Sequence, residues 1–95
     1  MYNFYSSKDS TNRLSFAARH QNGVLEVAVA RCSNKEHFVK RRGRAKAEGR
    51  LNGGKLFLTK KMEECSPKEF VETIAPFIEQ IEQNPAMINQ EVINL

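Results

Sequence analysis

The sequence is poor in the residues that build metal and redox sites. Among its 95 residues there are only two cysteines, Cys32 and Cys65, and two histidines. The cysteines have no CxxC spacing, and too few histidines accompany them for a zinc site. We therefore expect no metal and no cofactor, and we expect both cysteines to be reduced thiols in a cytosolic protein.

Long hydrophobic runs are also absent. No stretch resembles a membrane span, and the N-terminal segment MYNFYSSKDS is polar and aromatic, unlike a signal peptide. There is no internal repeat and no linker between domains. The sequence predicts one domain over residues 1–95, with residues 1–12 as a short strand or an arm and residues 84–95 as a C-terminal tail.

No catalytic motif stands out either. The segment Asn52-Gly53-Gly54-Lys55 resembles a phosphate-binding loop superficially. It follows a predicted helix and precedes a predicted strand, however, whereas a phosphate-binding loop follows a strand and precedes a helix. Neither cysteine has a histidine and a carboxylate close by in the sequence. We therefore expect a protein that is not an enzyme.

The segment RLSFAARHQNGVLEVAVARC predicts a β-hairpin. Asn22-Gly23 is the preferred pair for a two-residue type I′ turn, in which both positions need positive φ. This turn places Arg19 opposite Glu26. Alternation then predicts one core face, made of Leu14, Phe16, Ala18, Leu25, Val27 and Val29, while the other face carries Ser15, Arg19, Gln21, Glu26 and several alanines.

Two capping boxes predict two helices. Ser33 with Glu36, and Ser66 with Glu69, each have the three-residue spacing in which serine and glutamate satisfy orphan amides. The first helix should run from about residue 34 to 51, and the second carries an apolar stripe, kinked at Pro76, made of Phe70, Ile74, Phe77, Ile78 and Ile81. Between them, KLFLTKKM predicts a strand with Leu56 and Leu58 on one side and Phe57 on the other.

These elements predict an α+β fold in the order β-β-α-β-α. The N-terminal hairpin and a third strand form a small antiparallel sheet, and both helices pack on one face of it. The predicted core contains Phe16, Val27, Val29, Phe38, Leu56, Leu58, Phe70, Ile74, Phe77 and Ile81. For the tail AMINQEVINL, a short helix, an edge strand and a partner-binding arm all remain open.

Charge is distributed very unevenly along the chain. The formal net charge of +4 combines +1 over residues 1–30, +9 over residues 31–61 and −6 over residues 62–95. An uneven charge distribution is informative about binding partners and about the electric field of the protein, but not about its fold. The excess of positive charge over residues 31–61 therefore predicts an anionic partner.

The first predicted helix carries most of these cations. At 100° per residue, Phe38, Ala45 and Gly49 form a narrow apolar seam that would face the sheet. Arginine outnumbers lysine between positions 40 and 50, which suits bidentate recognition of phosphate or carboxylate. We expect Lys40, Arg41 and Arg44 to form the contact patch for nucleic acid or an acidic partner, with Lys46 and Arg50 contributing from its flank.

Two other interpretations of the basic helix stay open. Its charges could contact only water, as most charge runs do. Alternatively, the acidic second helix, with Glu69, Glu72, Glu79 and Glu82, could supply counter-charge within the molecule.

The segment RCSNKEHFVKRRGRAKAEGRL resembles a pattern in small accessory proteins of tailed bacteriophages. The resemblance covers about a fifth of the chain, and the matching residues are Arg31, Cys32, Ser33, Phe38, Gly43, Arg44, Gly49, Arg50 and Leu51. The resemblance implies a phage-encoded protein in the host cytoplasm, with no catalytic residues. It further implies an action on host nucleic-acid machinery or on defence systems, as in anti-CRISPR proteins.

Two function classes follow from the sequence. The first is a non-enzymatic nucleic-acid-binding module that uses the basic helix on phosphates. The second is an inhibitor of a host nucleic-acid-handling or defence complex, in which the same cations engage an acidic protein surface.

Overall fold

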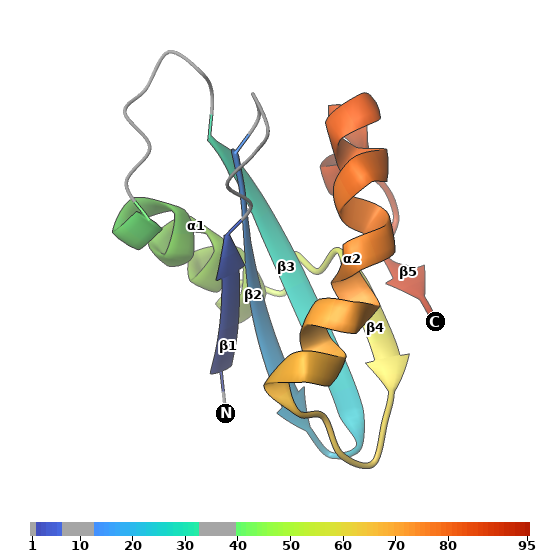
Figure 1. The fold of residues 1–95 in the computed structure, drawn as a ribbon. Helices are drawn as coiled ribbons and strands as arrows, with labels where there is room; N and C mark the ends of the chain where they lie inside the picture. The colour runs from blue at the N-terminus through green and yellow to red at the C-terminus, as the bar shows by residue number, and fades with distance from the viewer. Residues whose placement is uncertain (1, 7–12, 33–39) are drawn as a thin grey trace.

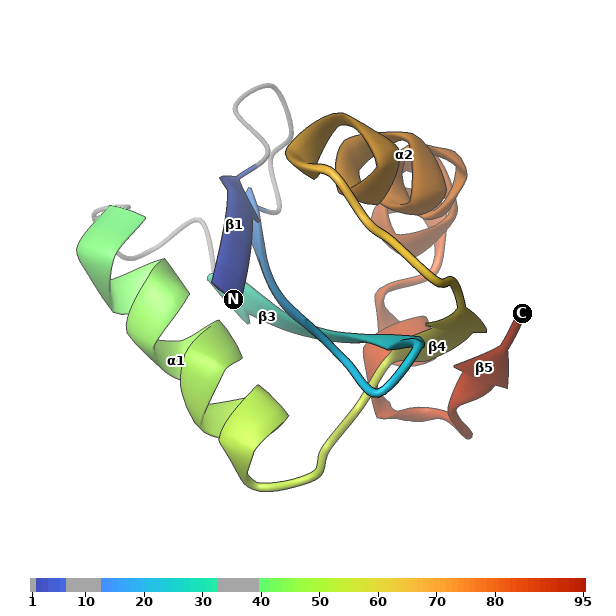
Figure 2. The same cartoon turned by 90° about the horizontal axis from the view of Figure 1, so that it is seen from below.

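In the computed structural model, a single sheet lies between two helices (Figures 1 and 2). The structure describes residues 2–6, 13–32 and 40–95, without the side chains of residues 2–6, 13, 32 and 40–42. The elements in chain order are β1 (Tyr2–Ser6), β2 (Arg13–Gln21), β3 (Val24–Cys32), α1 (Lys40–Asn52), β4 (Leu58–Lys61), α2 (Pro67–Gln83), the short 3₁₀ helix η1 (Pro85–Asn89) and β5 (Ile93–Asn94).

The sheet has five strands in the order β1-β2-β3-β4-β5, and only the β4–β5 pair is parallel. The α+β class is therefore confirmed, but a three-stranded antiparallel sheet is wrong because a strand is added at each edge. At the N-terminus β1 pairs antiparallel with β2, as the short-strand alternative predicted. At the C-terminus, the amide of Ile93 donates to Phe57 O (3.0 Å) and the amide of Leu95 to Thr59 O (2.8 Å).

The predicted hairpin is confirmed residue by residue. Gln21 pairs with Val24 and Arg19 with Glu26, and the turn residues Asn22 and Gly23 have φ of 53° and 73°. Nε of Arg19 donates to Oε1 of Glu26 at 3.2 Å, so the predicted cross-strand pair is an ion pair. All six residues of the predicted core face are buried in one cluster.

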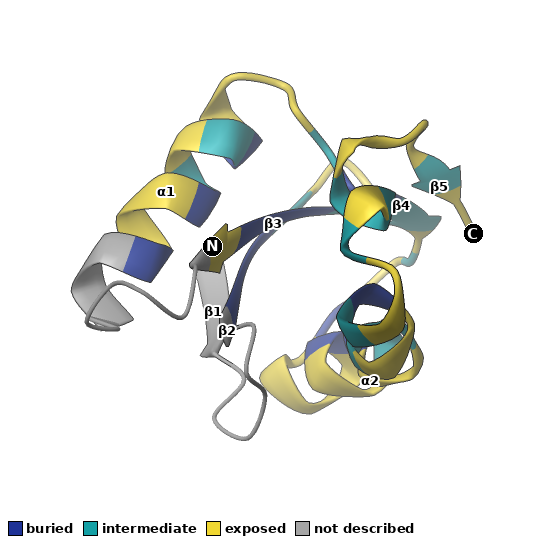
Figure 3. Ribbon diagram, turned by 90° about the horizontal axis from the view of Figure 1, so that it is seen from above, coloured by how far each residue is buried: buried dark blue, intermediate teal, exposed yellow. Residues whose placement is uncertain are grey.

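The two helices cover opposite faces of this hairpin, so packing on one face is wrong. Helix α2 packs on the face of large side chains, through Phe70, Ile74 and Ile81. Helix α1 packs on the alanine-rich face, where Ala47 and Leu51 join a second cluster with Ala17, Ala28 and Ala30 (Figure 3). Because alanines project so little, this face can be buried only by a helix that comes close to the sheet, and α1 does so with small residues.

Two residues of the predicted Phe38–Ala45–Gly49 seam, Ala45 and Gly49, do not face the sheet. In α1 the buried positions are Gly43, Ala47 and Leu51, spaced four residues apart, whereas Ala45 and Gly49 are exposed. Phe38 and the Ser33–Glu36 capping box lie outside the described residues. The apolar signal of this helix consists largely of alanine and glycine, so it cannot decide between two faces.

The approach to β4 also departs from simple alternation. Phe57 and Leu58 both pack in the cluster under α2, and Leu56 packs in the cluster under α1, so Leu56 and Leu58 do not share a side. The reason is a bend at Phe57, whose amide donates to Val27 O at 2.7 Å before β4 begins. A bend of this kind breaks the two-residue period.

Helix α2 begins as the sequence predicts. The hydroxyl of Ser66 accepts from the Glu69 amide at 3.2 Å, the Ser66 amide donates to Oε1 of Glu69 at 3.4 Å, and Pro67 occupies the first turn. The helix continues through Pro76 to Gln83. In the stripe, Phe70, Ile74 and Ile81 are buried, and Phe77 and Ile78 are half-buried.

Ile74 tests the packing of α2, because it is fully buried at the middle of the helix. We expect Ile74→Ala to lower the free energy of unfolding by about 2–5 kcal/mol, since it leaves a cavity that neighbours fill only in part. Val71→Ala, at an exposed position of the same helix, should cost less than about 1 kcal/mol. Urea unfolding measures both; equal losses would show that α2 does not pack through Ile74.

Candidate functional site

The way α1 packs decides where its cations lie. With about 100° of rotation per residue, Lys46 and Arg50 fall on one flank of the buried Ala47, and Arg44 and Glu48 fall on the other. Arg44 and Lys46 are exposed, and Arg50 is half-buried. The helix therefore divides the predicted cations between two sides.

The Lys46 and Arg50 flank faces a groove on the α1 side of the sheet. This basic groove has a volume of about 560 Å³ and draws on four segments, namely β3, α1, the α1–β4 connection and η1. Its lining residues are Ala30, Arg31, Lys46, Gly49, Arg50, Gly53, Lys55, Ile88 and Asn89.

The shortness of β4 makes room for this groove. Strand β4 pairs only with Val24–Val27 of β3, so the second half of β3 has no strand on that side. There η1 approaches, with Ile88 packed against the cluster under α2 while it also lines the basic groove. The groove thus has Ala30 and Arg31 between one wall from α1 and another from η1.

Four cations line the basic groove, and none of its nine lining residues is acidic. They are Arg31 from β3, Lys46 and Arg50 from α1, and Lys55 from the connection to β4. Like charges gathered around one groove repel one another, and a bound anion would reduce this repulsion. The arrangement is suited chemically to binding a polyanion.

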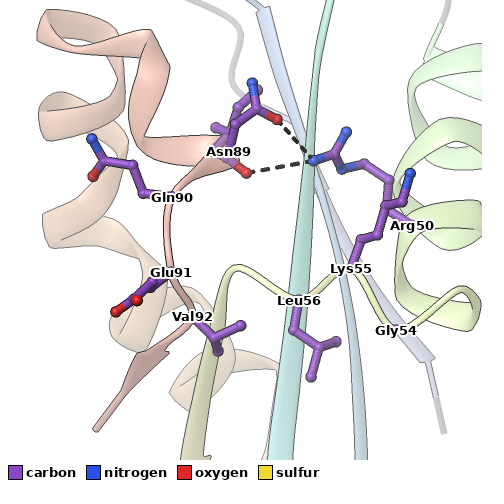
Figure 4. A pocket seen from close by; sticks show the side chains of 9 residues that line it. Arg50, Gly54, Lys55, Leu56, Asn89, Gln90, Glu91 and Val92 are labelled. Carbon is purple, nitrogen blue, oxygen red and sulfur yellow. Dashed lines mark hydrogen bonds between the residues drawn. The ribbon is translucent and has the colours of Figure 1, made fainter.

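Arg50 links the two walls. Its Nη2 donates to Ile88 O at 3.4 Å and to Oδ1 of Asn89 at 3.3 Å (Figure 4). Its Nε is buried and has no hydrogen-bond partner among the described residues. Both bonds are long and go to uncharged oxygens, so they do not neutralise the guanidinium and they use only part of its donor capacity.

A second pocket of about 400 Å³ adjoins the basic groove, and Arg50, Lys55, Ile88 and Asn89 line both. It extends along the tail to Val92, and it contains one carboxylate, that of Glu91. In Figure 4 this carboxylate points away from Arg50 and Lys55. The shared lining makes Arg50 and Lys55 the centre of a longer cationic surface.

The acidic side chains of α2 lie across the sheet from this surface. Glu69, Glu72 and Glu79 are exposed on α2, which covers the opposite face of the sheet from α1. Within the described ranges, α2 has an internal ion pair between Lys68 and Glu72 at 4.0 Å. No residue of α2 is among the described lining residues of the groove, so counter-charge from this helix would have to act across the sheet.

The structure thus brings together two of the five predicted site residues, Lys46 and Arg50. Arg44 lies on the other flank of α1, and the side chains of Lys40 and Arg41 lie outside the described part. Arg31 and Lys55 also line the groove but were not among the predicted site residues. Both belong to residues 31–61, the part of the chain with a net charge of +9. Arg31 is in a strand and Lys55 in a loop, and it is the tertiary fold that places them beside one flank of α1.

Cys65 lacks the surroundings of a catalytic nucleophile. Burial raises the pKa of its thiol, the Glu69 carboxylate raises it further, and the Lys60 ammonium lowers it. A raised pKa keeps the thiol protonated and unreactive near neutral pH. His20 has a structural contact instead. Its Nε2 donates to Met62 O at 2.6 Å, and this bond links β2 to the segment after β4.

No three His, Cys, Asp or Glu side chains gather as a metal site within residues 2–6, 13–32 and 40–95. Over the same ranges, no helix has both the length and the apolar character needed to cross a membrane. Comparison with models of protein families, with curated proteins and with solved structures found no match for the chain. The groove itself is therefore the basis on which a function can be inferred.

The environment of Cys65 predicts slow thiol chemistry in the folded protein. In a Cys32→Ser variant at pH 8, we expect Cys65 to react with a disulfide reagent at least about tenfold more slowly in buffer than in denaturant, because the buried thiol holds its proton. Stopped-flow absorbance would measure both rates. Equal rates would mean that the thiol is accessible and that its pKa is not raised.

Proposed function

We propose that the protein is a small non-enzymatic binding protein whose basic groove holds the phosphate backbone of a nucleic acid. The observation that carries the proposal is the convergence of Arg31, Lys46, Arg50 and Lys55 on one groove with no acidic lining residue. Lysine and arginine that replace condensed counterions supply most of the affinity in such complexes.

The shape of the basic groove favours a chain-like polyanion over a flat surface. Walls from α1 and η1 border it on two sides, and its length continues into the adjoining pocket through Arg50 and Lys55. A phosphodiester backbone presents evenly spaced charges along a narrow strand, whereas acidic protein surfaces spread theirs over a broad area. A nucleic-acid strand therefore fits better.

The alternative is a protein inhibitor that engages an acidic surface of a host nucleic-acid-handling or defence complex. The segregation of charge onto two faces supports this alternative too, because attraction to carboxylates and attraction to phosphates obey the same law. The resemblance to phage accessory proteins is compatible with both. Binding assays with purified nucleic acid separate the two.

The first test is a mobility-shift series with duplex DNA, single-stranded DNA and RNA from about 50 to 200 mM salt. If all four groove cations contact phosphates, the plot of log affinity against log salt should have a slope of roughly −3.6 for a duplex and −2.8 for a single strand. The arms also distinguish DNA from RNA. No shift at about 50 mM salt would contradict the proposal and favour the inhibitor.

Charge reversal on the two flanks of α1 tests the location. We expect Lys46→Glu to weaken binding about tenfold and to reduce the salt slope by about 1 or more, because Lys46 lines the groove. Arg44→Glu, the matched control with the same change of charge on the other flank, should weaken binding much less. Melting temperatures should show that both variants are folded, since exposed charges contribute little stability.

The opposite ranking would place the contact patch on the Arg44 side of α1, as the sequence alone predicts. Normal binding by both variants would mean that α1 is a solvated surface.

A further inference from the structure

Gly49 has no structural reason to be glycine. It lies inside α1, where glycine is less favourable than alanine, and its φ is outside the left-handed region. A Cβ built on it meets nothing within 4 Å, so no neighbour needs the space. The sequence predicted that this glycine lets the helix approach the sheet, but it is exposed and lines the basic groove.

Gly53 gives the contrasting case. A Cβ there would lie 3.1 Å from Gly49 O, so the turn that ends α1 explains this glycine. The same turn caps the helix, since the amides of Gly53 and Lys55 donate to the carbonyls of Gly49 and Arg50 at 3.0 and 2.8 Å. With those carbonyls occupied, the C-terminal end of α1 repels an anion less than an open helix end would.

The surroundings of Gly49 are those of an anion site. Lys46 precedes it by one turn on the same helix, Arg50 follows it, and Arg31 lines the same groove. The Nε of Arg50 is buried without an acceptor among the described residues, which leaves the guanidinium short of one hydrogen bond. Glycine at such a place allows a ligand to reach the backbone itself.

We infer that a phosphate of the bound strand lies directly against the backbone of α1 at Gly49, between the side chains of Lys46 and Arg50. The inference rests on the proposed function and adds the point of closest approach. Shape at Gly49, and not charge alone, then limits what the basic groove accepts. A side chain at position 49 would occupy the space that the phosphate needs, although the free protein has room for it.

This predicts substitutions that stabilise the fold and weaken binding. Gly49→Ala and Gly49→Leu should each raise the melting temperature by about 4 °C, because both residues favour a helix more than glycine does. Binding of the nucleic acid that shifts best should weaken about threefold for alanine and about tenfold or more for leucine. Fluorescence anisotropy with a labelled strand and thermal unfolding measure the two effects.

Ala45→Leu is the matched control, because Ala45 is exposed on the same helix and does not line the groove. It should leave affinity unchanged. Wild-type affinity in Gly49→Leu, with Lys46→Glu still defective, would overturn the inference and leave the groove as the binding site. Absence of binding by the wild-type protein would overturn both the inference and the proposed function.

Discussion

The register of the β2–β3 hairpin is the constraint on which the other elements depend. The left-handed pair Asn22-Gly23 sets Gln21 opposite Val24, and strict alternation then assigns every later side chain to a face. A slip of one residue in either strand would exchange its large apolar side chains with its alanines and polar residues. The fixed register instead yields one face of Leu, Phe and Val side chains and one face of alanines, and each face needs a different helix.

That difference explains why the two helices are so unlike. The large face is buried by α2, whose broad apolar stripe contacts it through residues such as Phe70 and Ile74. The alanine face needs a helix that comes close, and the buried residues of α1 among its described side chains are Gly43, Ala47 and Leu51. Because this contact is narrow, most of the surface of α1 is exposed to solvent. The helix can therefore carry many cations without burying their charges.

The hairpin, the cap of α2 and most of the core could be predicted because each has a strong local signal: a turn that needs positive φ, a Ser66–Glu69 capping box, and large apolar residues at regular spacing. The orientation of α1 could not, because alanine and glycine on several of its sides have nearly equal hydrophobicity. The alanines Ala17, Ala28 and Ala30 share their face of the hairpin with Arg19 and Glu26, so the sequence gave no sign that this face is buried. Strand β5 has only two residues, too few to show a period.

The basic groove depends on tertiary structure even more. Space for the groove exists because β4 stops after pairing with the first half of β3, and one of its walls comes from η1. Two of its cations belong to other elements than α1: Arg31 is in β3, and Lys55 is in the connection between α1 and β4. The bend at Phe57, the short β4 and the return of the tail are each modest features, yet together they convert one flank of α1 into a walled cationic surface. Without these walls, the cations on this flank of α1 would lie on an open surface in contact with water. Between the walls, which have a low dielectric constant, their electric field is stronger. Helix α2 packs on the opposite face of the sheet from α1, so the fold places its acidic side chains and the basic flank of α1 on different sides of the molecule.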